Sequence, residues 1–217
     1  MASDLSWDLI EQANNVSDNG LLRQIFWAKY VFWVVSFATL IIAMGVLSGV
    51  AWATIAFNVA LSWIWIISYL IAAYTRSNYK WGFFAFGLIA HLVLAYSTLH
   101  RGMRSARRVG ISRDHTMLSG WVNFLWLLYP IAWGVSDGGN VIGVTPSFIF
   151  FGILDLLTVA VTSLAFVALA RRWDYNALNI AFTQYGRVPT RLGTYPEKEA
   201  PGAAGRTHAP PAGTTAV

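Results

Sequence analysis

One carboxylate in this sequence stands in surroundings that are unfavourable for a charge. Asp155 lies in the middle of an apolar run, residues 146–170, in which it is the single charged residue. An ionisable group inside an apolar membrane helix is costly and by default marks a functional site. Asp155 must be neutral or held by hydrogen-bond donors such as Tyr129, Tyr30 and Lys29. We expect a network of Asp155 and Tyr129, which Lys29 reaches through water if at all; the alternative is a purely structural hydrogen bond.

Other reactive side chains are scarce. His91 has no carboxylate or second histidine three or four residues away, so we interpret it as a neutral histidine satisfied by a neighbouring helix, and we expect no metal site. The sequence contains no cysteine, which excludes disulfides and thiolate chemistry. Because no nucleophile–base pair or metal-ligand cluster occurs, we expect that the protein is not an enzyme.

The distribution of charge predicts an integral membrane protein. Charged residues make up 12% of the chain, about half the fraction that is usual in soluble domains. No charged residue occurs between Lys29 and Arg76, or between Lys80 and Arg101. Stretches of about 20 apolar residues are what a bilayer requires, and only hydrogen-bonded helices can form them here. We therefore expect the lipid bilayer to be the main partner of the chain. The net charge of +5 does not indicate nucleic-acid binding.

The apolar runs divide the chain into three parts. We expect an extracellular segment over residues 1–22, a transmembrane bundle over 23–172 and a mostly disordered cytoplasmic tail over 173–217, which begins with a short amphipathic helix at 174–185. Within the bundle, five membrane helices are predicted, at about 23–46, 50–74, 81–100, 116–136 and 146–170.

Arginine placement predicts the orientation of these helices. Two groups of arginines fall on the same side of a five-helix zigzag, and they are Arg101, Arg104, Arg107, Arg108, Arg113, Arg171 and Arg172. The positive-inside rule makes this side cytoplasmic, with the N-terminus outside and the C-terminus inside. Binding of anionic lipid headgroups by the same arginines is an alternative interpretation.

Four segments carry a resemblance to a known family. They are RQIFWAKYVFW (23–33), YKWGFFAFG (79–87), LWLLYPIAWGVSDGGNVI (125–142) and FFGILDLL (150–157). In this order, separated by apolar segments, they resemble the fungal branch of the microbial (type 1) rhodopsins over roughly residues 1–172. The resemblance implies an all-α, bacteriorhodopsin-like helix bundle. It also implies that the five helices correspond to the family's third to seventh, so that the first two are missing from this chain.

The same resemblance implies that covalent retinal binding has been lost. In the family, a lysine that forms a Schiff base with retinal follows the last-helix aspartate by one turn. Here that aspartate is Asp155, and Val159 stands at the lysine position. The other lysines of the chain, Lys29, Lys80 and Lys198, lie at a helix end, in a loop and in the tail. We therefore expect no covalent cofactor.

Proton pumping is expected to be lost as well. The family's acceptor aspartate corresponds to Phe32 and its cytoplasmic proton donor to Ala43. These positions are eleven residues apart on one helical face, along which only Ser36 remains as a hydroxyl. Phe37 and the alanine that follows it replace the usual Thr-Pro pair, and Asp137 is the one acid left of the outer group.

The walls of the retinal pocket, by contrast, are similar to those of the family. The residues that match pocket residues of the family are Trp33, Trp126, Tyr129, Pro130 and Trp133. Of these, Trp126, Tyr129 and Trp133 form one helical stripe. One interpretation is that they persist because the core was built around them. The other is a noncovalent site for retinal, a carotenoid fragment or a sterol-like lipid.

The resemblance extends to an opsin-related branch that lacks the Schiff-base lysine. That branch is associated with stress and with restraint of the plasma-membrane proton ATPase. It implies, as the first hypothesis, a chaperone-like or regulatory protein of the plasma membrane whose partner is this ATPase or a second copy of the chain. A passive ion channel or transporter and a noncovalent retinoid- or carotenoid-binding photoreceptor are the alternatives.

Overall fold

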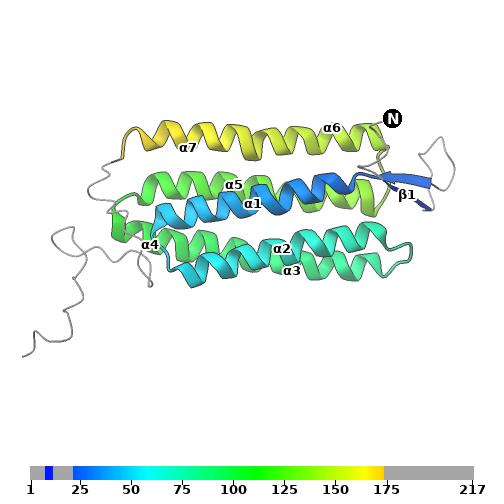
Figure 1. Ribbon diagram of the computed structural model, residues 1–217, viewed down its shortest axis with the longest axis horizontal. Coiled ribbons are helices and arrows are strands. Elements are labelled where there is room, and N and C mark those ends of the chain that lie inside the picture. The colour runs from blue at the N-terminus through cyan, green and yellow to red at the C-terminus, as the bar shows by residue number, and fades with distance from the viewer. Residues whose placement is uncertain (1–7, 12–21, 174–217) are drawn as a thin grey trace, which may run out of the picture.

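The described part of the protein is a mostly helical bundle built on five helices that are long and apolar enough to cross a membrane. A computed structural model describes residues 8–11 and 22–173 (Figure 1). The five spans lie side by side along one axis, as the sequence predicted for a bacteriorhodopsin-like bundle. The remaining residues, which include the predicted helix at 174–185 and nearly all of the predicted tail, lie outside the described residues.

The first helix begins later than the predicted residue 23. A two-stranded antiparallel sheet precedes it, in which β1 (Asp8–Glu11) pairs with β2 (Leu22–Ile25). Helix α1 (Trp27–Ser48) begins two residues after β2 and is capped by Gly49, whose φ of +71° is readily adopted by glycine. The prediction placed the helix start at a polar pair, Arg23 and Gln24, because it did not anticipate that their backbone is paired in a sheet.

The second helix, α2 (Trp52–Tyr74), packs against α1. Trp63 of α2 donates its indole N–H to the backbone carbonyl of Val34 in α1, at 3.1 Å. This bond joins the two helices inside the apolar zone, where a backbone carbonyl has no water as a competing partner.

The third span is longer than predicted. Helix α3 (Lys80–Tyr96) continues through a π-helical turn, η1 (Ser97–Arg101), into α4 (Gly102–Val109). The predicted span ended at about residue 100. Arginine is a good helix former, and the first left-handed residue, Gly110 with a φ of +84°, is what ends the helix.

The last two spans contain π-helical turns too. Helix α5 (Ser112–Trp133) leads into η2 (Gly134–Gly138), whereas α6 (Val144–Asp155) continues through η3 (Leu156–Val161) into α7 (Thr162–Ala170). The span that contains α5 is the most buried of the five. In its most apolar stretch 56% of the residues are buried, compared with 17% for the span from α6 to α7. Many of the buried aromatic residues of the core come from α5 and from α1, which contacts it.

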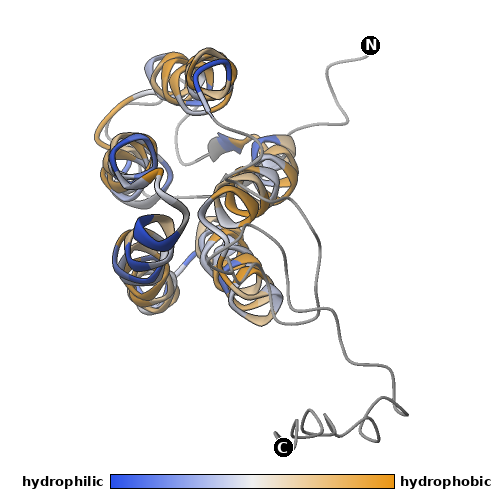
Figure 2. Cartoon of the chain, turned by 90° about the vertical axis from the view of Figure 1, so that its left-hand side faces the viewer, coloured by the Kyte–Doolittle hydropathy of each residue, from blue (hydrophilic) through white to orange (hydrophobic). Residues whose placement is uncertain are grey.

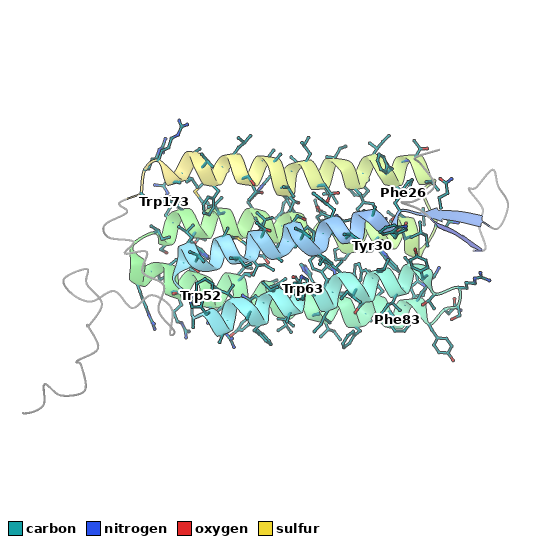
Figure 3. All side chains as sticks on the ribbon, in the orientation of Figure 1. Phe26, Tyr30, Trp52, Trp63, Phe83 and Trp173 are labelled. Atoms are coloured by element: carbon teal, nitrogen blue, oxygen red, sulfur yellow. The ribbon has the colours of Figure 1, made fainter. Side chains whose placement is uncertain are left out.

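Both arginine groups lie at one end of the bundle. The indole N–H of Trp173, just after α7, donates to Asp114 at the start of α5, at 2.8 Å. Figure 3 shows Trp173 at this end and Phe26 and Phe83 at the opposite end. Viewed along the bundle in Figure 2, hydrophilic residues gather at the near end, where α4 lies, and apolar residues cover the helices. This arrangement agrees with the zigzag expected from the sequence.

Candidate functional site

Asp155 is held by two neutral donors from two other helices. The hydroxyl of Tyr129 (α5) donates to Asp155 Oδ1 at 2.8 Å, and the indole N–H of Trp33 (α1) donates to the same oxygen at 2.8 Å. The carboxyl group thus joins α1, α5 and α6 at one point. Such bonds are favourable in an apolar interior, where a buried acceptor without partners would be costly.

Thr158 extends this network and was not among the residues selected from the sequence. Its hydroxyl lies 3.2 Å from the hydroxyl of Tyr129. A phenol has a single hydrogen, so Thr158 donates to Tyr129 while Tyr129 donates to Asp155. The spacing of three residues between Asp155 and Thr158, which places both on one helical face, is the signal that could have identified it.

Val159 is half-buried and lies within the π-helical turn η3. Its side chain has no amine and no hydrogen-bonding group. Thr158, its neighbour in η3, is the residue that hydrogen-bonds to Tyr129.

Lys29 and Tyr30, the other candidate donors to Asp155, both bind a different carboxylate. Lys29 Nζ forms an ion pair with Asp137 in η2, and the hydroxyl of Tyr30 donates to the same oxygen of Asp137 at 2.9 Å. Trp133 then donates its indole N–H to the Tyr30 hydroxyl at 3.0 Å. Tyr30, one of the candidate donors to Asp155, therefore donates to the carboxylate of Asp137 instead.

Aromatic rings from the two polar clusters are in direct contact. The centroids of Tyr30 and Trp33 are 5.0 Å apart in an edge-to-face arrangement. Lys29 Nζ lies 4.2 Å from the ring centroid of Phe151, which is a favourable cation–π distance. The side chain of Lys29 therefore has both an anion and an aromatic face as partners.

Phe37 occupies the centre of the aromatic cluster. Its ring centroid lies 5.2 Å from that of Tyr129, 5.3 Å from Trp126, 5.5 Å from Trp65 and 6.2 Å from Trp33. These are the distances of directly packed rings. The predicted pocket residues Trp33, Trp126 and Tyr129 are therefore brought together, but around a phenylalanine of the chain itself. Neither Phe37 nor Trp65 was selected as a pocket residue from the sequence.

The other predicted pocket residues lie further toward the α1 start. Trp133 is fully buried and stacks on Phe84 of α3, with centroids 5.1 Å apart. Pro130 is buried inside α5, where it removes one backbone donor from the helix. Trp133 thus connects the aromatic stripe of α5 to the Asp137 cluster.

The positions of the expected proton path do not converge on Asp155. The side chain of Phe32 is 44% exposed on the outside of the described bundle, and Ala43 is half-buried. Ser36 is also half-buried, and its hydroxyl has no hydrogen-bond partner among residues 8–11 and 22–173. These three residues do not connect Asp155 to either end of the bundle by hydrogen bonds.

Comparison with known proteins agrees with this architecture of a rhodopsin-type helix bundle. The family model described as Bacteriorhodopsin-like protein matches residues 1–173, and the chain belongs to this family. It is 36% identical over 162 residues to the opsin-like protein carO of Fusarium fujikuroi, covering 72% of this chain and 53% of carO. It is 28% identical over 179 residues to the 30 kDa heat shock protein of Saccharomyces cerevisiae, covering 74% of this chain and 53% of that protein.

A solved structure shows the same fold. The light-driven proton pump rhodopsin CsR of Coccomyxa subellipsoidea aligns with a TM-score of 0.70 and 25% identity, covering 76% of this chain and 72% of the pump. The chain spans about half the length of the curated relatives that it matches, 53% for each of the two above. The comparisons confirm the resemblance to fungal opsins that the sequence motifs indicated.

Replacing Tyr129 by phenylalanine tests the Asp155 network. We expect Y129F to lower the free energy of unfolding by about 1–2 kcal/mol, because the ring is kept while a buried acceptor loses a donor. Thermal unfolding of purified protein in detergent measures the change. Tyr96→Phe is the matched control, since the Tyr96 side chain is 61% exposed. Equal stability of Y129F and the parent protein would contradict the network.

Replacing Lys29 by methionine tests the ion pair with Asp137. We expect K29M to destabilise the protein by up to about 3 kcal/mol, because it leaves a buried carboxylate without its cation. The double variant K29M/D137N removes both charges and should recover part of this loss. The same unfolding measurement applies, and a double variant that is less stable than K29M would argue against the pair.

Proposed function

We propose that the protein is a non-photochemical member of the rhodopsin family that acts through contacts with other membrane proteins. In this proposal it binds no retinal covalently, pumps no protons and catalyses no reaction. The main observation in its support is the set of residues around Asp155. Its carboxyl group is bound by Trp33 and Tyr129, and the family's lysine position holds Val159.

The chemistry of a Schiff base supports the first part. An imine forms between the aldehyde of retinal and a free amine, and the valine side chain has no nucleophile. Of the lysines in the described part of the chain, Lys29 pairs with Asp137 and Lys80 is the first residue of α3, at the edge of the apolar zone. Neither provides an amine beside Asp155 in the way that the family's lysine does.

The packing around Phe37 bears on both alternatives. A noncovalent retinoid or carotenoid at the inherited pocket would have to displace Phe37 from four neighbouring aromatic rings. A passive channel would need a polar path past the layer of Phe37, Trp65 and Trp126. Each of these side chains is at most 2% exposed, and such a layer is a poor lining for ions. The packing therefore favours a closed core over a ligand pocket or pore.

The biological part of the proposal is a stress-associated, chaperone-like or regulatory role at the plasma membrane. The similarity to a yeast protein named as a heat shock protein supports it. The arginines at the α4 end favour a cytoplasmic location for that end, with β1 and β2 outside. The proposed partners are a plasma-membrane proton ATPase or a second copy of the chain.

Retinal reconstitution tests the photochemical part. Purified protein in lipid is incubated with all-trans-retinal, reduced with borohydride and analysed by mass spectrometry of the intact chain. We expect no retinyl adduct, because Val159 at the family's lysine position has no amine. The Coccomyxa pump, treated in parallel, is the positive control. A reduced adduct on any of the three lysines, Lys29, Lys80 or Lys198, located by digestion of the labelled protein, would overturn this part of the proposal.

A deletion strain of the source organism tests the biological part. We expect lower survival after heat and acid challenge, restored by the parent gene, together with co-purification of a plasma-membrane ATPase from mildly solubilised membranes. The variant Y129F, which weakens the core, should restore survival less well than the control Tyr96→Phe. Unchanged survival of the deletion strain in both challenges would refute the stress role.

A further inference from the structure

A second polar cluster lies in the half of the bundle toward α4, away from Asp155. It surrounds a cavity between α1, α2, η1 and α5 that offers about 20 Å³ to the centre of a water molecule. Its polar lining residues include Asn58 from α2, Ser97 and Thr98 from η1, and His115 from α5. None of these belongs to the Asp155 or Asp137 clusters.

Three polar atoms of this lining have no partner in the part of the chain that the structure describes. They are Asn58 Oδ1, Ser97 Oγ and His115 Nδ1. Asn58 is 5% exposed, Ser97 3% and His115 2%. Buried polar atoms are nearly always hydrogen-bonded, so three such atoms around one cavity indicate a bound group.

The shape of the helix at the cavity is a separate indication. The π-helical turn η1 begins at Ser97, and π-helical turns are frequent at functional sites. Gly102, which follows η1, lies so close to His115 that an added Cβ would stand 2.7 Å from the ring carbon Cε1. The glycine therefore allows the backbone to close over the imidazole and complete the cavity wall.

We propose that this cavity holds an ordered water molecule that hydrogen-bonds to Asn58, Ser97 and His115. A buried water needs roughly 10–15 Å³ for its centre and two to four polar partners, and the cavity provides both. The lining that contacts it is neutral, with an amide, hydroxyls and an imidazole, which suits water better than an ion. The water donates to Asn58 Oδ1 and completes the hydrogen bonding of Ser97 Oγ and His115 Nδ1.

His91 provides an internal control for this site. It is 1% exposed and its Nδ1 also has no partner among the described residues, but it is not part of the cavity lining. Its ring instead packs on Trp65, with centroids 4.3 Å apart. The two buried histidines therefore differ in access to the cavity and not in burial.

Magic-angle-spinning NMR of the protein in lipid bilayers tests the proposal. Replacing His100 and His208 by glutamine leaves His91 and His115 as the two ¹⁵N-labelled imidazoles. We expect magnetisation transfer from water to the His115 ring to be several-fold faster than transfer to the His91 ring. Equal transfer to both rings, or none to His115, would overturn the proposal.

Variants of the other lining residues identify the site of this water. Asn58→Leu replaces the acceptor by an apolar group of similar size and should abolish or strongly slow the transfer to His115. Ser97→Ala provides a second test if N58L does not fold. The matched control is Ser62→Ala, since Ser62 is buried on the same helix and donates to Val59 within α2. Unchanged transfer in a folded N58L or S97A would refute the assigned site.

Discussion

The structure depends on the need to give a carboxyl group hydrogen-bond partners within an apolar bundle. Asp155 meets this need through two neutral donors, the indole of Trp33 and the phenol of Tyr129. Because the donors lie on α1 and α5, one carboxyl group specifies how three helices approach one another. In this structure the aspartate serves as a polar junction between helices.

The aromatic core is arranged around the same junction. Trp33 and Tyr129 each use one polar atom for Asp155 and their ring faces or edges for Phe37. The ring of Phe37 fills space between residues that resemble the walls of a retinal pocket. The proposed loss of an amine at Val159 and of an acceptor carboxylate at Phe32 is consistent with the filling of this centre by Phe37.

Most of the fold could be predicted from the sequence, because apolar runs without charges have few structural solutions in a membrane. The runs containing Trp33, Trp126 and Asp155 were recognised as spans, and the pairing of Asp155 with Tyr129 was expected from their types and depth. The start of α1 was misplaced, since the pairing of β2 with β1 depends on backbone contacts that leave no apolar pattern. The helical continuation through α4 was missed because arginines in a short segment between apolar runs also fit a loop.

The partners of individual polar groups were harder to predict. Lys29 and Tyr30 bind Asp137, and Thr158 joins Tyr129 in the network. Asp137 and Thr158 both lie in π-helical turns, η2 and η3. Single-sequence spacing assumes a regular α-helix and cannot locate these turns.

The peripheral position of the span from α6 to α7 has a mechanical consequence. Its 27 residues extend about 40 Å at the rise of an α-helix, whereas the hydrocarbon layer of a bilayer is about 30 Å thick. A helix longer than this layer adjusts by tilting. Within the described bundle this span is the least buried of the five, so its tilt is the least restrained by packing. A tilt would reach the interior through Asp155 and Thr158, which hydrogen-bond to residues of α1 and α5.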